Sequence, residues 1–248
     1  MTFKQYAVRL QILVLVIVLQ VLGGRDVHAQ DAPSKKSASS IGKLRINKLL
    51  ILGNSVAIHG PAPQIGWTGN WGMAASSRDK DFAHVLHSQL RIATQGEPQL
   101  LVLNLADFER QQTEFDFEVG LKEALEFEAD VVIVAIGANA PALETEDAKQ
   151  RFRTAFEQLL NRLQQKKPTA LLVRGEFWPD PEKEKIMREV CEKAGGSYVP
   201  LPNLNSDPAN LGSADQKFEH AGVAGHPGDR GMRLIADELW RAIEKISK

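Results

Sequence analysis

The sequence predicts an α/β protein, a three-layer α/β/α sandwich built around a five-stranded parallel sheet. Five short apolar runs alternate with longer amphipathic segments along the chain. The middle runs are almost continuous in valine, leucine and isoleucine, which is typical of parallel strands buried on both faces. Because such sheets place ligand sites beyond the carboxyl ends of their strands, functional side chains are expected directly after the apolar runs.

The first residues of the 248-residue chain predict an export signal. A positively charged start precedes an apolar run over 10–22 that is interrupted only by glutamines, and the small residues Val27 and Ala29 have the spacing of a cleavage site. The run is shorter than the ~20 residues that span a bilayer. We expect a signal peptide over 1–29, cleaved near Ala29, and a periplasmic or secreted mature form without membrane association. An uncleaved N-terminal anchor is the alternative.

The remainder predicts a flexible linker over 30–44, rich in serine and lysine, and one domain over 45–248. The net charge of −1 and a pI near 6.6 give no reason to expect nucleic acid or an anionic membrane as a partner. Cys191 is the single cysteine, so no intrachain disulfide can form, and we expect a buried thiol without a catalytic role.

The elements follow from the apolar pattern. In 145–166, apolar residues from Ala148 to Leu163 recur every three or four positions, the period of a helix. Pro227 and Asp229 are both favourable at the start of the last helix. Strands are predicted at 46–53, 99–106, 130–137, 169–177 and 196–201, and helices at 79–93, 115–128, 145–166, 182–194 and 227–247.

Three polar residues are expected at one rim of the sheet. Ser55 follows the first strand, Asn139 follows the third, and His226 directly precedes the last helix. Acyl transfer needs a nucleophile, a donor to the oxyanion and a base, and serine is a weak nucleophile without an imidazole partner. Each residue alone is more often a turn or cap residue. Their joint placement at strand ends is what favours a catalytic site.

The order of these segments resembles the SGNH (GDSL-type) hydrolase superfamily over about 45–247. The resemblance implies a flavodoxin-like sandwich that acts without a cofactor, in a family of esterases, lipases, thioesterases and carbohydrate deacetylases. It implies Ser55 as the nucleophile, His226 as the general base and Asn139 as a side-chain donor to the oxyanion, together with the Ser55 N–H. Asn54 stands where many members have aspartate.

The chain departs from the family's oxyanion hole. The family supplies a glycine N–H shortly after the second strand, whereas 104–112 contains no glycine. A main-chain N–H near Phe108 or Glu109 would take its place, or that of Gly72 in the long first loop.

The second departure is the acid of the triad. The family usually has aspartate three residues before the histidine, and this chain has Val223 there. Either the site is a Ser-His dyad whose imidazole bonds a backbone carbonyl, or a carboxylate reaches the ring, with Glu219 and Asp229 as candidates. We favour the dyad, which should lower the basicity of His226 without abolishing turnover.

A loop of 23 residues, 56–78, follows the nucleophile, and a connection of this length is usually functional. Trp67 and Trp71 are candidates for a substrate wall, because indole faces pack well on apolar sugar faces. The alternative is that both fold inward and pin the loop. Asn54 is a further candidate for substrate contact. Glu176, after the fourth strand, either shapes the pocket or only packs.

The sequence therefore predicts an exported serine esterase that forms an acyl-enzyme, with an O-acetylated carbohydrate as the preferred substrate. The partner would be a small-molecule or glycan ester. The resemblance implies that no cofactor is needed, and no metal is expected at His84 and His87, because they lack the glutamate of the HExxH motif. A lipase or thioesterase acting on longer acyl chains is the enzymatic alternative. The other is a non-catalytic glycan-binding domain.

Overall fold

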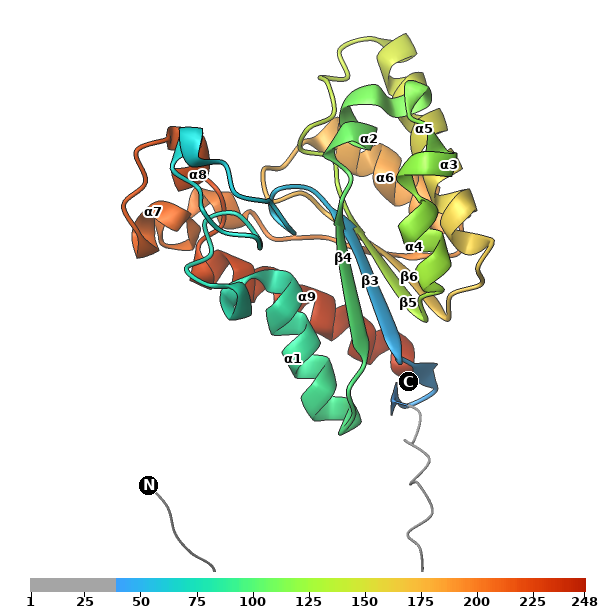
Figure 1. Cartoon of the computed structure of the whole chain (residues 1–248). Coiled ribbons are helices and arrows are strands. Elements are labelled where there is room, and N and C mark those ends of the chain that lie inside the picture. Colours follow the sequence, from blue (N-terminus) through green and yellow to red (C-terminus); the bar gives the residue numbers. More distant parts are fainter. Residues whose placement is uncertain (1–38) are drawn as a thin grey trace, which may run out of the picture. The chain divides into compact units, whose positions relative to one another are not determined.

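The computed structural model describes residues 39–248, so the predicted signal peptide and the first part of the predicted linker lie outside the described residues. Five parallel strands form one sheet in the order β4-β3-β5-β6-β7 (Figure 1). The predicted fold class is confirmed. The strands are β3 (Lys48–Gly53), β4 (Gln99–Asn104), β5 (Val131–Ala135), β6 (Ala170–Arg174) and β7 (Ser197–Val199).

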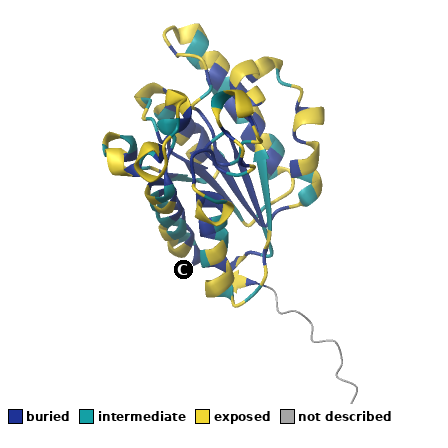
Figure 2. Cartoon of the chain, turned by 60° about the vertical axis from the view of Figure 1, so that its left-hand side comes forward, coloured by how far each residue is buried: buried dark blue, intermediate teal, exposed yellow. Residues whose placement is uncertain are grey.

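Helices cover both faces of the sheet. On one face, α1 (Phe82–Thr94) and α9 (Asp229–Ser247) pack against Leu49 and Ile51 of β3. The other face of β3, with Leu50 and Leu52, packs against the layer of α4 (Lys122–Phe127), α5 (Glu146–Gln164) and α6 (Pro181–Lys193). Because successive strand residues point to opposite faces, a continuous apolar strand feeds both cores. Figure 2 shows the buried central strands between helices whose outer faces are exposed, whereas the edge strand β4 is only half-buried.

The strand order brings the ends of β3, β4 and β5 together. β3 lies between the other two and pairs with both in parallel, with Gly53 opposite Asn104 of β4 and Ala135 of β5. The connection that leaves β3 runs through α1 on one face, and the connection that leaves β4 runs through α4 on the other, which opens a crevice at the carboxyl end of β3. The segments that follow these three residues share one edge of the sheet.

Two predicted elements differ from the observed ones after β4. The strand ends at Asn104, whose side-chain oxygen accepts the Ala106 N–H at 2.9 Å and starts α2 (Ala106–Gln111), so the prediction of a strand to 106 is too long. The predicted helix over 115–128 is two helices, α3 (Phe117–Gly120) and α4. Asp116 caps the first by accepting two backbone N–H groups.

The domain begins earlier than predicted. β1 (Ser40–Ile41) and β2 (Leu44–Arg45) form an antiparallel hairpin whose Leu44 is buried in the core. The Lys43 N–H donates to the Ser247 carbonyl at 3.0 Å, which ties the hairpin to the end of α9. The predicted linker over 30–44 is therefore wrong for residues 39–44, because an apolar side chain and a backbone bond fix them to the domain.

The long first loop meets the segment between β7 and α9. Trp67 and Met73 of the loop form a small apolar cluster with Val223, and in Figure 1 this part lies beyond the carboxyl end of β3. Among residues 39–248, no helix combines the length and apolarity needed to cross a bilayer. The short elements here and elsewhere are η1 (Pro63–Ile65), η2 (Arg78–Lys80), η3 (Gln112–Glu114), η4 (Leu204–Ser206), η5 (Pro208–Asn210), α7 (Gly212–Asp215) and α8 (Ala221–Ala224).

Candidate active site

Ser55 lies in a tight turn directly after β3. The Asn54 carbonyl accepts the N–H groups of Ala57 and Ile58, and its side-chain oxygen accepts that of Val56 at 3.1 Å. This turn leaves the Ser55 side chain at the lip of the sheet, where it is half-buried. No acceptor for the Ser55 N–H is found within the described chain. Both the hydroxyl and the amide are thus available to a ligand.

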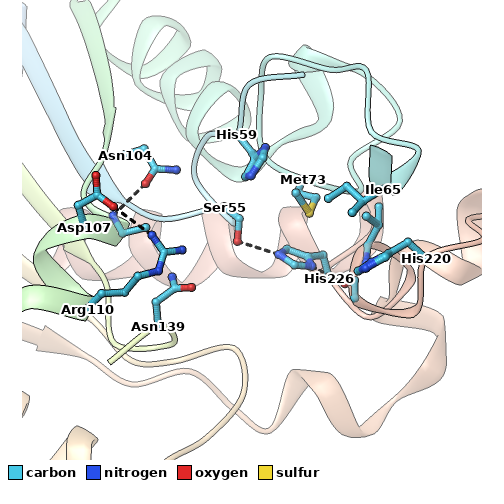
Figure 3. Close-up of a pocket in the computed structure, with 13 residues that line it drawn as sticks. Ser55, His59, Ile65, Met73, Asn104, Asp107, Arg110, Asn139, His220 and His226 are labelled. Carbon is cyan, nitrogen blue, oxygen red and sulfur yellow. Dashed lines mark hydrogen bonds and ion pairs between the residues drawn. The ribbon is translucent and has the colours of Figure 1, made fainter. Parts of the chain in front are cut away.

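His226 faces this hydroxyl. Its Nε2 lies 2.8 Å from Ser55 Oγ, and its Nδ1 lies 2.6 Å from the Gly222 carbonyl oxygen (Figure 3). A carbonyl only accepts, so Nδ1 carries the proton and Nε2 is left to accept from the serine. Burial lowers the pKa of His226, the Gly222 carbonyl opposes this, and His59 and His220 lower the pKa further. The ring is therefore neutral at neutral pH, as a general base must be.

No carboxylate bonds the His226 ring in residues 39–248. Glu219, the predicted acid, is exposed and the ring's Nδ1 is taken by Gly222 instead. The other predicted candidate, Asp229, accepts from the backbone and hydroxyl of Ser76 at 2.8 and 2.7 Å. The arrangement is thus the one in which a backbone carbonyl orients the imidazole, since α8 carries that carbonyl one turn before the histidine.

Asn139 lies in the loop after β5 and is held by Glu109. Asn139 Nδ2 donates to Glu109 Oε2 at 2.6 Å, and the Asn139 N–H donates to Oε1 at 3.3 Å. Glu109 is wholly buried on α2, where its Oε1 also accepts the Gly137 N–H at 2.5 Å and Asn54 Nδ2 at 3.1 Å. One carboxylate therefore joins the Ser55 turn to the loop that carries Asn139.

Of the main-chain donors predicted for the oxyanion beside that of Ser55, those of Glu109 and Gly72 are already engaged, which leaves Phe108 as the one whose bond is not seen among the described residues. The Glu109 N–H donates to the Leu105 carbonyl inside α2, and the Gly72 N–H donates to Asp81 Oδ2 at 3.1 Å. Glu109 reaches the site through its carboxylate, which the sequence interpretation missed. Gly72 is buried away from it. The available donors toward a bound carbonyl are the Ser55 N–H and the Asn139 side chain.

A cavity of about 440 Å³ opens over Ser55, Asn139 and His226. Figure 3 shows its two unlike sides. The polar side is formed by Asn104, Asp107 and Arg110, and the other side carries Ile65, Met73, His59 and His220. In the described part of the chain, no group of three His, Cys, Asp or Glu side chains is placed to hold a metal ion.

The predicted tryptophan wall is not in this cavity. Trp67 is buried and its Nε1 donates to the His59 carbonyl at 3.1 Å, while Trp71 Nε1 donates to the Ala75 carbonyl at 2.9 Å. The two rings meet edge to face with centroids 5.5 Å apart. Both therefore hold the loop from inside, and Trp67 shares one apolar cluster with Met73. Asn54 is also buried, so the prediction that it contacts substrate is wrong.

Glu176 lies behind the asparagine loop and does not line the cavity. It is only 3% exposed, and its carboxylate occupies the space that a side chain at Gly137 would need. Gly137 has φ +132°, which favours glycine for a second reason. Burial raises the pKa of Glu176 to about 8, with Lys183 and Arg174 acting in the opposite direction and Asp180 adding to the rise. Glu176 thus packs and shapes the loop.

Comparisons with solved structures show the same fold. The chain resembles a GDSL-like lipase from Bacteroides uniformis, with 17% identity, 81% of this chain and 96% of that chain covered, and a TM-score of 0.53. An acetyl xylan esterase from Butyrivibrio proteoclasticus is 17% identical, with 81% of this chain and 64% of that chain covered and a TM-score of 0.52. A family two carbohydrate esterase from Clostridium thermocellum, solved with cellohexaose, is 14% identical, with 81% of this chain and 64% of that chain covered and a TM-score of 0.51. At these identities the likeness establishes the fold.

No curated protein matches the chain. The model of the GDSL-like lipase/acylhydrolase family matches residues 51–234, a span that begins in β3, ends in α9 and includes Ser55, Asn139 and His226. Most of the domain is therefore covered, and all three polar residues lie inside the matched span. The chain belongs to the GDSL-like lipase/acylhydrolase family of the SGNH hydrolase superfamily and is a carboxylic ester hydrolase.

Proposed function

We propose that this protein is an exported serine esterase that removes O-acetyl groups from a carbohydrate through a Ser55–His226 dyad. The observation that carries the proposal is the 2.8 Å contact between Ser55 Oγ and His226 Nε2, in a cavity that also holds Asn139. A hydroxyl that bonds the unprotonated nitrogen of a neutral imidazole is placed for activation.

In the first half of the reaction, Ser55 Oγ attacks the ester carbonyl carbon while His226 Nε2 takes the hydroxyl proton. The carbonyl oxygen becomes an oxyanion, which the Ser55 N–H and Asn139 Nδ2 stabilise. The alcohol then leaves with the proton held by His226, and the acyl group stays on Ser55. In the second half, water adds to the acyl carbon as His226 takes its proton. Ser55 regains that proton when the acid leaves.

The choice of a carbohydrate is supported by the polar side of the cavity and by the esterases that share the fold. Arg110 and Asp107 offer donors and acceptors that suit sugar hydroxyls. Arg110 also lines a second cavity of about 290 Å³, whose other polar residues include Gln111, Thr113 and Arg151. A glycan longer than one sugar would follow this path from the serine along α2.

The apolar side of the cavity supports a second candidate. Ile65, Met73 and Val223 present hydrocarbon next to His226, which suits a longer acyl chain and hence lipase or thioesterase activity. Rates with acetyl and octanoyl esters of one chromogenic alcohol separate the two candidates. Acetyl preference supports the deacetylase, and octanoyl preference supports the alternative.

The proposed esterase activity is tested by comparing the hydrolysis of a chromogenic acetyl ester by the wild type and by Ser55→Ala. Ser55→Ala is expected to lose activity by several orders of magnitude, as losing a catalytic serine does elsewhere. The matched control, Ser88→Ala on the exposed surface of α1, is expected to keep it. A serine-reactive phosphonate should label Ser55. A wild type with no turnover and no label, but with affinity for acetylated oligosaccharide, would support the glycan-binding alternative instead.

Export is tested separately. The full chain, expressed in a bacterial host with a secretion pathway, is expected to yield a mature protein that begins near Gln30. Intact mass and N-terminal sequencing of the extracytoplasmic fraction measure this. A full-length chain that stays with the membrane would support the uncleaved anchor.

A further inference from the structure

We propose that the buried carboxylate of Glu109 is a positioning residue that fixes the Asn139 amide so that one of its N–H bonds faces the oxyanion. This inference rests on the proposed esterase function. The role differs from that of a main-chain donor, because the Glu109 N–H is already used inside α2.

The first argument is the number of donors that converge on this carboxylate. Four N–H groups reach it: Asn54 Nδ2, the backbones of Gly137 and Asn139, and Asn139 Nδ2, at 3.1, 2.5, 3.3 and 2.6 Å. An ionised carboxylate only accepts, with about four lone-pair positions, so this set satisfies it. A buried acid with four donors is built into the site and is not a surface charge that happens to point inward.

The second argument is the geometry of an amide. The Nδ2 of Asn139 carries two hydrogens, and the bond to Glu109 Oε2 uses one of them. The other remains for the cavity, which Asn139 lines. A carboxylate repels the amide oxygen, so the amide cannot turn over and present that oxygen to the substrate carbonyl. An oxygen in that place would repel the oxyanion that the nitrogen should stabilise.

The third argument concerns charge. A carboxylate this near the oxyanion would oppose catalysis unless a positive charge offset it. The Arg174 guanidinium is buried at the end of β6, and burial lowers its pKa to about 10 while Glu176 and Glu109 act in the opposite direction. The group therefore stays charged at neutral pH. Its Nε and Nη1 have no hydrogen-bond partner among the described residues. Arg174 therefore acts through its field and not through a particular bond, which suits a counter-charge for the Glu109 carboxylate.

Steady-state kinetics with acetyl ester test the role. Asn139→Ala is expected to lower kcat by about 10²–10³, the usual effect of removing one oxyanion donor. Glu109→Gln should lower kcat by about 10–10², with KM within about threefold, because the donor matters only in the transition state. The double variant should be no slower than Asn139→Ala, since Glu109 acts through Asn139. Glu123→Gln, on the exposed face of α4, is the matched control.

Two kinetic outcomes would overturn the inference. One is wild-type kcat in Glu109→Gln, and the other is a double variant whose loss equals the product of the single losses. If Glu109→Gln does not fold, Glu109→Asp replaces it, because it keeps the charge and the acceptors on a shorter stem. Glu109→Asp is then expected to keep KM and lose kcat. A KM rise with kcat intact would overturn the role.

A spectroscopic measurement separates this inference from the proposed function. In protein labelled with ¹⁵N-asparagine, the Asn139 side-chain amide is assigned by its disappearance in Asn139→Ala. One amide proton is expected far downfield in the wild type, from its bond to a carboxylate, and should return toward ordinary values in Glu109→Gln, while the exposed Asn161 stays unchanged. If the wild type hydrolyses ester no faster than Ser55→Ala, only the proposed esterase function is refuted. If the Asn139 amide proton has the same chemical shift in the wild type and in Glu109→Gln, the Glu109 contact is refuted.

Discussion

Glu109 and Lys183 hold Gly137 from opposite sides. The Gly137 N–H donates to Glu109 Oε1 at 2.5 Å, and the Gly137 carbonyl accepts from Lys183 Nζ at 3.3 Å. Lys183 Nζ also donates to the Ala140 carbonyl at 2.8 Å. The loop that carries Asn139 is thus fixed between a buried carboxylate on α2 and a buried ammonium on α6.

This relationship predicts the effect of removing the ammonium. Lys183→Met keeps the apolar stem and leaves the Gly137 and Ala140 carbonyls without their charged donor. The free energy of unfolding should fall by about 1–3 kcal/mol. Urea unfolding measures it, with the exposed Lys185→Met on the same helix as control. Equal stability of the two variants would show that the Lys183 bonds contribute nothing net.

The lowered pKa of His226 predicts the pH dependence of activity. The base must be neutral, so kcat/KM should fall as pH drops through the pKa of the free enzyme. Because burial lowers this pKa, the midpoint of the acid limb is expected below 6.5, the ordinary histidine value. The rate of phosphonate labelling at Ser55 should follow the same curve, since it needs the same base. A midpoint at or above the ordinary value would contradict a buried, neutral His226.

Glu176 predicts a pH dependence of stability. Its folded pKa of about 8 lies above the ordinary value of 4.5, so between these two pH values the folded state holds a proton that the unfolded state has lost. The contribution of Glu176 to the free energy of unfolding should therefore be largest below about pH 4.5 and fall as the pH rises to about 8, by a few kcal/mol at ~1.4 kcal/mol per pKa unit.

The variant Glu176→Gln removes this titration. Its stability relative to the wild type should rise steadily between pH 5 and 9, measured by urea unfolding at several pH values. The exposed Glu182→Gln on α6 serves as the control. A difference between Glu176→Gln and wild type that does not change with pH would show that Glu176 titrates normally.

The position of Arg110 predicts that its removal affects KM differently for long and short substrates. It lines both the serine cavity and the adjoining cavity along α2, whereas a small chromogenic ester fills only the first. Arg110→Ala is therefore expected to raise KM for an acetylated oligosaccharide about tenfold, the loss of roughly one charge-assisted hydrogen bond. KM for the chromogenic ester should change little. Arg233→Ala, exposed on α9, is the control. Equal effects on both esters would remove the second cavity from the substrate path.

The sequence located the three rim residues because their positions depend on chain order. Ser55 and Asn139 follow strands that the apolar runs reveal, and His226 precedes a strongly amphipathic helix. In a parallel sheet these positions meet at one edge whatever the detailed packing. The placement was thus predictable, and so was the Gly222 carbonyl as one of two alternatives for the histidine partner.

The role of Glu109 was not predictable in the same way. Its neighbours Asp107 and Arg110 are exposed, and a glutamate between them has the pattern of a solvated helix face. Burial comes from two loops that lie 55 and 28 residues away in sequence, at Asn54 and Gly137. The prediction that Trp67 contacts substrate was wrong for the same reason, since only the folded loop shows that its indole turns inward.

The distance between the proposed nucleophile and base has a consequence for folding. Ser55 and His226 are 171 residues apart in the chain, and Lys43 and Ser247 tie the same two regions together again at the other end of α9. No fragment short of nearly the whole domain contains the site. The rate at which ester hydrolysis recovers during refolding is therefore expected to report the rate at which the last helix docks. This step brings together distant parts of the chain and is slow compared with the formation of local helices.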